Sequence, residues 1–255
     1  MASYDILGNI VIIKGEGKSK RQKVVQAKKL LKNPNIKTVL EKIGNVHGRL
    51  RTINVKHIAG KKNLIALHKE NDCMFKFNVK TCYFSSRLSN ERKSIAQKIK
   101  KKDRILVMFA GVGVYPIVIY KYVKPKEIIG VEIGRDCSKY FKENLKLNKI
   151  SFERIKIIQG DVKRKVNRGL GKFDVVIMTR PNLKHSFLEQ GFSVCKKDTK
   201  IFYYGFCRDN EIKSLVKDIK EEAKKFKKKI KILRVVKAGE IAPYKFRYRI
   251  EIKVL

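Results

Sequence analysis

The chain has 255 residues, of which 62 are Lys or Arg and 23 are Asp or Glu, so its formal net charge is +39. This excess of positive charge excludes an ordinary metabolic enzyme and predicts a polyanionic partner, with nucleic acid as the first hypothesis. Hydrophobic residues make up 43% of the chain, which is enough to bury a core and excludes wholesale disorder. A Lys-rich thermophilic proteome is the alternative, but thermophile surfaces usually balance Lys with Glu, and acidic residues are few here.

The cysteines and histidines indicate neither a disulfide framework nor a metal site. Five cysteines contain no CxxC pair, and the four histidines show no paired ligand spacing. The N-terminus turns polar too early for a signal peptide, and no uncharged apolar run reaches about 18 residues. We therefore expect a soluble, cytoplasmic protein without a membrane span or a metal. A monomer is expected as well, but nothing in the sequence decides the oligomeric state.

The first third of the chain predicts a small α+β domain. Residues 3–14 are rich in β-formers, and a Gly- and Lys-rich break separates them from VVQAKKLLKN, which has helical spacing. The segment from TVLEKI to CYF is typical of short strands joined by polar turns. We place this domain at residues 1–88 and expect it to bind and position RNA.

The pattern changes at residue 89, where SNERKSIAQKIKKK predicts a helix with Ser89 or Asn90 as its N-cap. Strand-like and helical segments then alternate from RILVMFAGVG to TKIFYYGF, which predicts a mainly parallel, doubly wound sheet. The last two strand-like segments are joined only by GEIAPYK and should pair as an antiparallel hairpin. Residues 89–255 therefore predict a Rossmann-like α/β domain.

Three successive strands of this sheet end in residues that suit an adenosyl group. The turn FAGVG carries Gly111 and Gly113, which let backbone N–H groups approach a ligand, but Pro116 stands where a dinucleotide fingerprint has its third Gly. Glu132 ends the next strand and can accept both ribose hydroxyls, while Asp161 ends the third and can face an adenine amine. The set favours S-adenosylmethionine over NAD; the alternative is that the glycines only form a tight turn and both carboxylates are solvated.

Several segments together resemble known families. Three segments together resemble the class I methyltransferases, namely FAGVG, VEIGRDCSKYFKENLKLN and QGDV. The tRNA guanosine-37 N1-methyltransferases and their wyosine-forming relatives contain a segment that is similar to CYFSSRLSNERKSIA. Three further segments resemble the same family, namely SYDILGNIVIIK, HGRLR and APYKFRYRIEIKV. The resemblance therefore spans nearly the whole chain. It implies methyl transfer from S-adenosylmethionine to N1 of guanosine 37 in the tRNA anticodon loop.

The resemblance also implies roles for single residues. Glu91 corresponds to the carboxylate that takes the proton from guanine N1, although its place in the first turn of a helix also suits a purely structural role. Arg51 corresponds to the arginine that stabilises charge on guanine O6, with Arg49 as the alternative register. Tyr83 corresponds to an aromatic residue that closes over the cofactor; the alternative is a core aromatic. The further cofactor-binding residues implied are Arg87, Phe109, Gly111, Gly113, Glu132, Ile133, Asp161, Val162, Thr179 and Pro181.

Two departures from the family pattern leave the target open. Val107 stands where family members carry an acid, and Thr179-Arg180-Pro181 replaces Asn-Leu-Pro, so an amide that helps to hold the target base is missing. The alternatives are methylation of C7 in the tricyclic wyosine precursor at the same tRNA position, methylation of another RNA, or RNA binding by a decayed site.

Overall fold

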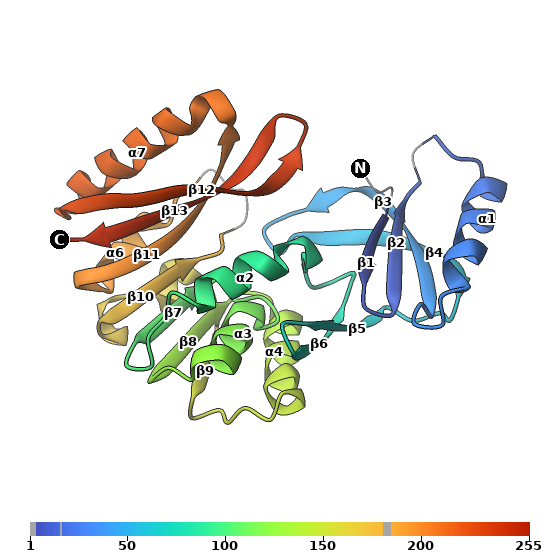
Figure 1. The fold of residues 1–255 in the computed structure, drawn as a ribbon, viewed down its shortest axis with the longest axis horizontal. Helices are drawn as coiled ribbons and strands as arrows, with labels where there is room; N and C mark the ends of the chain where they lie inside the picture. Colours follow the sequence, from blue (N-terminus) through green and yellow to red (C-terminus); the bar gives the residue numbers. More distant parts are fainter. Residues whose placement is uncertain (1–3, 16, 181–184) are drawn as a thin grey trace.

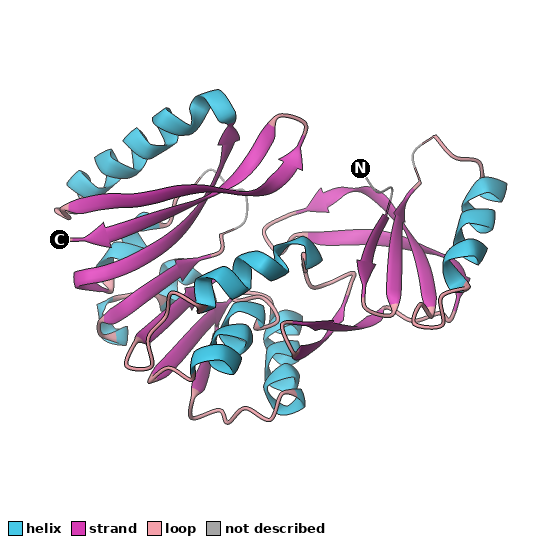
Figure 2. Cartoon of the chain, in the orientation of Figure 1, coloured by secondary structure: helices cyan, strands magenta, loops and turns pink. Residues whose placement is uncertain are grey.

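A computed structural model describes residues 4–15, 17–180 and 185–255. Figure 1 shows a small unit that contains the N-terminus beside a larger unit built around a long twisted sheet. Helices cover both faces of that sheet (Figure 2). The predicted fold class, an α/β methyltransferase-like domain preceded by a small α+β unit, is confirmed. No helix within the described ranges is long and apolar enough to cross a membrane.

The small unit is a four-stranded sheet with one covering helix. Its elements are β1 (Tyr4–Leu7), β2 (Ile10–Lys14), α1 (Lys20–Leu31), β3 (Thr38–His47) and β4 (Thr52–Gly60), and the strand order is β1-β2-β3-β4. The described part of the segment rich in β-formers, residues 4–14, forms a hairpin and not a single strand, because Gly8 adopts φ +60° and allows a tight turn. Strands β2 and β3 run parallel, so the chain needs the crossover that α1 provides.

The large unit carries a seven-stranded sheet in the order β12-β13-β11-β10-β7-β8-β9. Its strands are β7 (Arg104–Met108), β8 (Glu127–Glu132), β9 (Ile155–Gln159), β10 (Phe173–Met178), β11 (Cys195–Arg208), β12 (Ile230–Ala242) and β13 (Lys245–Val254). The first five run parallel, while β12 and β13 form the predicted antiparallel hairpin, with β13 inserted between β11 and β12. The order reverses between β7 and β10, which is where ligands bind in such sheets.

Helices pack on the two faces of this sheet because its central strands are apolar on both sides. The helices are α2 (Ser89–Ala96), α3 (Val114–Val123), α4 (Arg135–Leu147), α5 (Val162–Lys165), α6 (Leu188–Ser193) and α7 (Ile212–Lys225). Along β7, Ile105 and Val107 belong to the apolar cluster shared with α2, α3 and α4. Leu106 and Met108 belong to the cluster shared with α5, α6 and α7.

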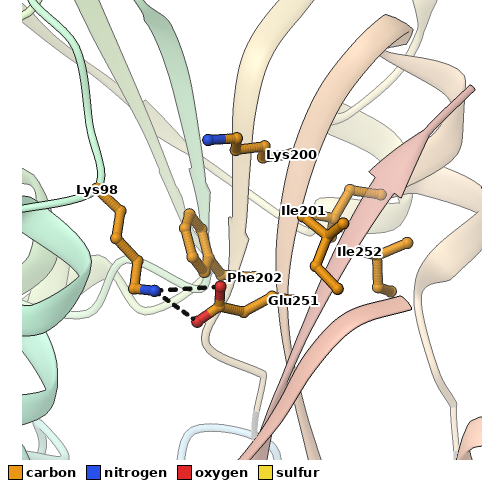
Figure 3. Close-up of a pocket in the computed structure, with 7 residues that line it drawn as sticks. Lys98, Lys200, Ile201, Phe202, Glu251 and Ile252 are labelled. Carbon is orange, nitrogen blue, oxygen red and sulfur yellow. Dashed lines mark hydrogen bonds and ion pairs between the residues drawn. The ribbon is translucent and has the colours of Figure 1, made fainter. Parts of the chain in front are cut away.

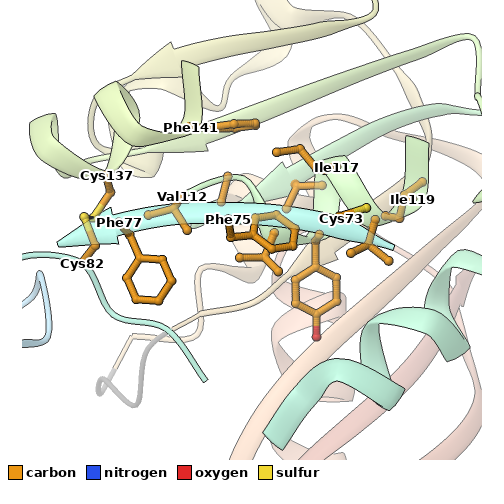
Figure 4. Packing of buried hydrophobic residues seen from close by; sticks show 14 of the residues in the cluster. Cys73, Phe75, Phe77, Cys82, Val112, Ile117, Ile119, Cys137 and Phe141 are labelled. Carbon is orange, nitrogen blue, oxygen red and sulfur yellow. Dashed lines mark hydrogen bonds between the residues drawn. The ribbon is translucent and has the colours of Figure 1, made fainter. Parts of the chain in front are cut away.

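A separate hairpin, β5 (Ile65–Glu70) with β6 (Cys73–Asn78), bridges the two units. Phe75 and Phe77 are fully buried in the apolar cluster of the large unit, and Figure 4 shows Phe77 beside Val112 of the turn before α3. Asn144 of α4 pairs with β6 as a neighbouring strand would, since its amide accepts from Lys76 N at 2.7 Å and donates to Lys76 O at 3.1 Å. This hairpin therefore packs on the large unit, although the sequence placed it within residues 1–88.

A buried ion pair fixes α2 to this hairpin. Arg92 donates to both carboxylate oxygens of Glu70 at 2.5 Å and to Ser85 O at 2.9 Å. Arg92 and Glu70 are 3% and 7% exposed, so the pair is shielded from solvent screening. The pair sets the position of α2, the helix that carries Glu91.

Candidate active site

The turn after β7 brings backbone N–H groups to the edge where a cofactor is expected. Gly111 and Gly113 adopt φ +57° and +88°, and Phe109 is also left-handed at φ +63°. A Cβ on Gly111 would meet nothing within 4 Å, whereas a Cβ on Gly113 would lie 2.1 Å from the ring of Phe141. Gly111 thus faces open space that a ligand can occupy, while Gly113 is required by helix packing.

Glu132 joins this turn to the end of β8. Its carboxylate accepts from Gly111 N at 2.8 Å and from Gly134 N at 2.7 Å. Burial raises the pKa of Glu132 above its ordinary value, although the hydrogen bonds from Gly134 and Gly111 counteract this shift. Each carboxylate oxygen keeps a further lone pair, so Glu132 can also accept from ribose hydroxyls. Ile133 follows it, and its carbonyl accepts from Gln159 Nε2 at 3.0 Å.

Asp161 lies after β9 and caps α5, whose first residue, Val162, is buried. Its carboxylate accepts from Lys163 N at 3.0 Å and forms a 2.7 Å ion pair with Arg49. Burial would raise the pKa of Asp161, but the hydrogen bonds from Arg49 and Lys163 N lower it below the ordinary value. Arg49 comes from the turn between β3 and β4, so the small unit reaches the edge where a cofactor is expected. A ligand that binds Asp161 must share or displace Arg49.

The residues after β10 complete this edge. The Thr179 hydroxyl donates toward Phe109 O at 2.9 Å and Met108 O at 3.1 Å, and so holds β10 against the glycine turn. Pro181, predicted to bind the cofactor, lies outside the described residues. Val107 is fully buried in the apolar core and presents no polar group in place of the family's acid.

A second cluster surrounds Tyr83. The guanidinium carbon of Arg51 lies 4.6 Å from the Tyr83 ring centroid. Arg51 adopts φ +56°, a strained conformation for a residue with a Cβ and one that is common at functional sites. Burial would raise the pKa of Tyr83, but Arg247 and Arg51 lower it below the ordinary value. Arg87, predicted to bind the cofactor, forms a 2.6 Å ion pair with Asp5 of β1.

Glu91 lies at the centre of a third cluster that the sequence did not reveal. Its Oε1 accepts from Tyr204 Oη at 2.6 Å and from Arg249 Nη1 at 2.6 Å. The Tyr204 hydroxyl in turn accepts from Tyr115 Oη at 3.0 Å. Among the described residues, Glu91 Oε2 has no hydrogen-bond partner. One oxygen is thus fixed and the other is available to accept a proton.

This network continues along β13 to Glu251. Arg249 donates to Glu251 at 2.8 and 3.0 Å, and Lys98 pairs with Glu251 at 3.1 Å. Figure 3 shows the Lys98–Glu251 pair in a small pocket on the sheet face that also contains Phe202. None of the predicted cofactor residues lines this pocket, so it is separate from the edge formed by Gly111 and Glu132.

The structure therefore brings some predicted residues together and separates others. Gly111, Glu132 and Thr179 lie at one edge of the sheet. Gly111 N donates directly to Glu132, and Thr179 donates to the carbonyl of Phe109 in the same turn. Glu91 and Arg51 lie in different clusters, and the predictions of their roles stay predictions. Tyr204 and Arg249 were missed; the available signal was FRYRIEIKV, where a charged residue recurs at every second position of an internal strand. Within the described ranges, no group of three or more His, Cys, Asp or Glu side chains could hold a metal ion.

The two glycines of the turn give a matched pair of variants. Gly111→Ala should cost about 1 to 2 kcal/mol of stability because of its positive φ, and should weaken S-adenosylmethionine binding about tenfold or more. Gly113→Ala should cost about 2 to 5 kcal/mol because the new methyl also overlaps Phe141, with cofactor affinity retained in the folded fraction. Urea unfolding and calorimetric titration measure both. Unchanged cofactor affinity in Gly111→Ala would contradict this assignment.

Comparison with known proteins accounts for nearly the whole chain. The TRM5/TYW2 methyltransferase domain matches residues 66–233, and the TYW2 N-terminal domain matches residues 1–63. The first range begins at the second residue of β5, so nearly all of the bridging hairpin falls within the match to the methyltransferase domain. The division at residue 88 stays a prediction.

Individual relatives agree with this match. A tRNA (guanine(37)-N(1))-methyltransferase Trm5b of Pyrococcus abyssi is 33% identical over 259 residues, covering 99% of this chain and 74% of the relative. A tRNA (guanine(37)-N(1))/4-demethylwyosine(37)-methyltransferase Taw22 of Nanoarchaeum equitans is 31% identical, covering 99% of this chain and all of the relative. A solved complex of aTrm5 with tRNALeu superposes with a TM-score of 0.86 at 27% identity, covering 100% of this chain and 72% of that one. With this fold, this glycine turn and these matches, the chain belongs to the TRM5/TYW2 methyltransferase family.

Proposed function

We propose that the protein transfers a methyl group from S-adenosylmethionine to N1 of guanosine 37 in the anticodon loop of tRNA. The observation that best supports this reaction is the Glu91 carboxylate, which has one oxygen held by two donors and one oxygen without a partner among the described residues. The names of the Pyrococcus and Nanoarchaeum relatives agree with this substrate.

Three residues of this chain suit the cofactor. Gly111 offers open space beside its backbone, Glu132 can accept the ribose hydroxyls, and Asp161 can accept the adenine amine. When bound, S-adenosylmethionine supplies an activated methyl group on a positively charged sulfur, which leaves as a neutral thioether. The protein's task is then to orient the base and to remove its proton.

N1 of neutral guanine carries a hydrogen, which must leave as the methyl group arrives. Glu91 Oε2 accepts this proton, the N1–H electron pair remains on nitrogen, and that nitrogen forms the new bond to the methyl carbon as the methyl–sulfur bond breaks. Arg51 stabilises the negative charge that develops on O6 during proton loss. Within the described residues Arg51 has no carboxylate partner, so its charge is available for this role.

The high positive charge of the chain suits a large, polyanionic substrate such as tRNA. A net charge of +39 favours phosphate contacts along an RNA and predicts binding that weakens steeply with salt. A base stacked in a loop is unreachable, so nucleotide 37 must flip out to reach the site. Cytoplasmic location and a monomeric state stay predictions from the sequence.

A second reaction is supported by a specific observation at the base site. Thr179 has no amide to offer the base where the family carries an asparagine, and its hydroxyl already donates to backbone carbonyls. A changed contact beside the base fits methylation of C7 in the tricyclic wyosine precursor, and the name of the Nanoarchaeum relative includes such a substrate. Loss of a ring proton is needed there too, so Glu91 can serve both reactions.

Labelled methyl transfer to two tRNAs tests both candidates. One tRNA carries guanosine 37, the other carries the tricyclic precursor, and the products are identified as nucleosides by mass spectrometry. We expect 1-methylguanosine from the first substrate. Product from both would establish a bifunctional enzyme, and product only from the second would make C7 methylation the function. Product from neither would overturn the proposed function and point to another RNA or to a decayed site.

A further inference from the structure

We propose that Arg249 is a positioning residue for methyl transfer, which together with Tyr204 fixes Glu91 Oε1 and so leaves Oε2 to accept the ring proton. This inference rests on the proposed function, because it assigns to Arg249 a role that acts through Glu91. Arg249 lies on β13, the last strand of the chain, whereas Glu91 lies on α2, far earlier in the sequence.

The strand pairing places the two donors side by side. Tyr204 of β11 lies directly opposite Arg249 of β13 in the antiparallel register, and their side chains therefore share one face of the sheet. The side chain of Arg249 is 3% exposed and that of Glu91 is 12% exposed. Both donors lie 2.6 Å from the same carboxylate oxygen, a geometry that holds the carboxylate in a single orientation.

Arg249, and not the neighbouring Arg92, is the arginine that orients the Glu91 carboxylate. The neighbouring arginine on α2, Arg92, already donates to both oxygens of Glu70. Arg249 instead lies between two carboxylates, Glu91 and Glu251. Burial would lower the pKa of Arg249, but Glu91, Tyr204 and Glu251 raise it, so the guanidinium stays charged.

The second carboxylate matters after the proton has moved. Once Glu91 is neutral, Arg249 keeps Glu251 as a charged partner, and Glu251 is also paired with Lys98. No buried carboxylate or guanidinium of this cluster is then left without an opposite charge, which would be costly at this depth. The arrangement can therefore accept a proton at Glu91 without rearranging its other ion pairs.

Single-turnover methyl transfer to tRNA with guanosine 37 tests the proposal. We expect Arg249→Gln to lower the rate about 100-fold through misplacement of Glu91, with dissociation constants for tRNA and S-adenosylmethionine within about twofold of wild type. Arg249→Lys keeps the charge and should recover part of the rate. The matched control is Arg104→Gln, which breaks a 2.5 Å pair with Glu127 at the amino end of β7 and should leave the rate of the folded protein unchanged.

A double-mutant cycle separates positioning from a structural role. In a Glu91→Gln background, Arg249→Gln should lower the rate by less than about threefold further, because its effect passes through the Glu91 carboxylate. The proposal would be overturned if the rate losses of Glu91→Gln and Arg249→Gln multiplied in the double variant. It would also be overturned if the Arg249→Gln enzyme were as active as the Arg104→Gln control. If Arg249→Gln does not fold, Tyr204→Phe removes the other donor, and it should lower the rate about tenfold, with the same non-additivity.

Failure of the inference is distinguishable from failure of the proposed function. A wild-type enzyme that forms no 1-methylguanosine would defeat the proposed function itself. A wild-type enzyme that is active and is disabled by Glu91→Gln but not by Arg249→Gln or Tyr204→Phe would defeat only the assignment of Arg249.

Discussion

Replacing Glu91 by Gln should lower the rate of methyl transfer by about 10²- to 10⁴-fold, the usual contribution of a positioned general base. The amide oxygen of Gln can still accept from Tyr204 and Arg249, so the cluster around it should stay intact. The other end of the amide carries hydrogens and has no lone pair for a ring proton. Single-turnover kinetics measure the rate, and calorimetric titration should show an S-adenosylmethionine affinity within about twofold of wild type.

A carboxylate elsewhere in the first turn of a helix provides the control. Glu189 lies in the first turn of α6 and is exposed, so Glu189→Gln should change stability by a few tenths of a kcal/mol and leave the rate unaltered. If Glu91→Gln behaved like Glu189→Gln, Glu91 would have only the structural role that its helical position allows. The favoured mechanism would then need another base.

Replacing Arg92 by Met should lower the free energy of unfolding by about 3 to 5 kcal/mol, because it removes the two short contacts of Arg92 and leaves the buried Glu70 carboxylate with the longer 3.6 Å contact to His68. The double replacement Arg92→Met with Glu70→Leu should recover most of this loss, since an apolar pair of similar volume needs no desolvated charge. Urea unfolding of wild type, single variant and double variant at neutral pH measures the effect. Equal losses in the two variants would show that packing, and not charge, dominates at this site.

The same pair predicts a pH dependence of stability. Burial would raise the pKa of Glu70, but His68 and Arg92 lower it, so the folded state has a lower pKa than the unfolded chain. The unfolded chain therefore binds more protons, and the stabilisation is complete above the ordinary carboxyl pKa of about 4.3 and lost as the pH falls through the folded value. Unfolding followed from pH 7 downward should show a shallower decline for the Arg92→Met, Glu70→Leu double variant than for wild type.

Local patterns in the sequence were sufficient to predict that the glycine turn and Glu132 lie together at one edge of the sheet. The glycine turn and Glu132 each end a buried strand, and the carboxyl ends of neighbouring parallel strands must meet at one edge. The roles of the two glycines could not be separated in this way, because the difference depends on Phe141, which reaches Gly113 from α4. The same holds for Arg49 and Arg51, whose partners Asp161 and Tyr83 come from other parts of the chain.

The cluster around Glu91 could not be predicted from local patterns. Tyr204 and Arg249 are 113 and 158 residues away from Glu91 in sequence, and only the pairing of β11 with β13 brings them to the same oxygen. The role of Glu91 as a general base rests on resemblance to a family and stays a prediction. Hydrophobic periodicity also indicated the strands at residues 65–78 but carried no information on which unit they pack against, which Phe75 and Asn144 decide.

The insertion of β13 between β11 and β12 also bears on the order in which the molecule is assembled during translation. The segment of β12 is made before β13, yet it has no neighbour in the sheet until β13 arrives. Glu91 likewise emerges 158 residues before the arginine that pairs with it. A nascent chain that has not yet made β13 can form the edge that carries Gly111 and Glu132 but leaves β11 as an open strand, which is a template for aggregation. The enzyme should therefore acquire its activity and its protection from misassembly in the same late step of synthesis.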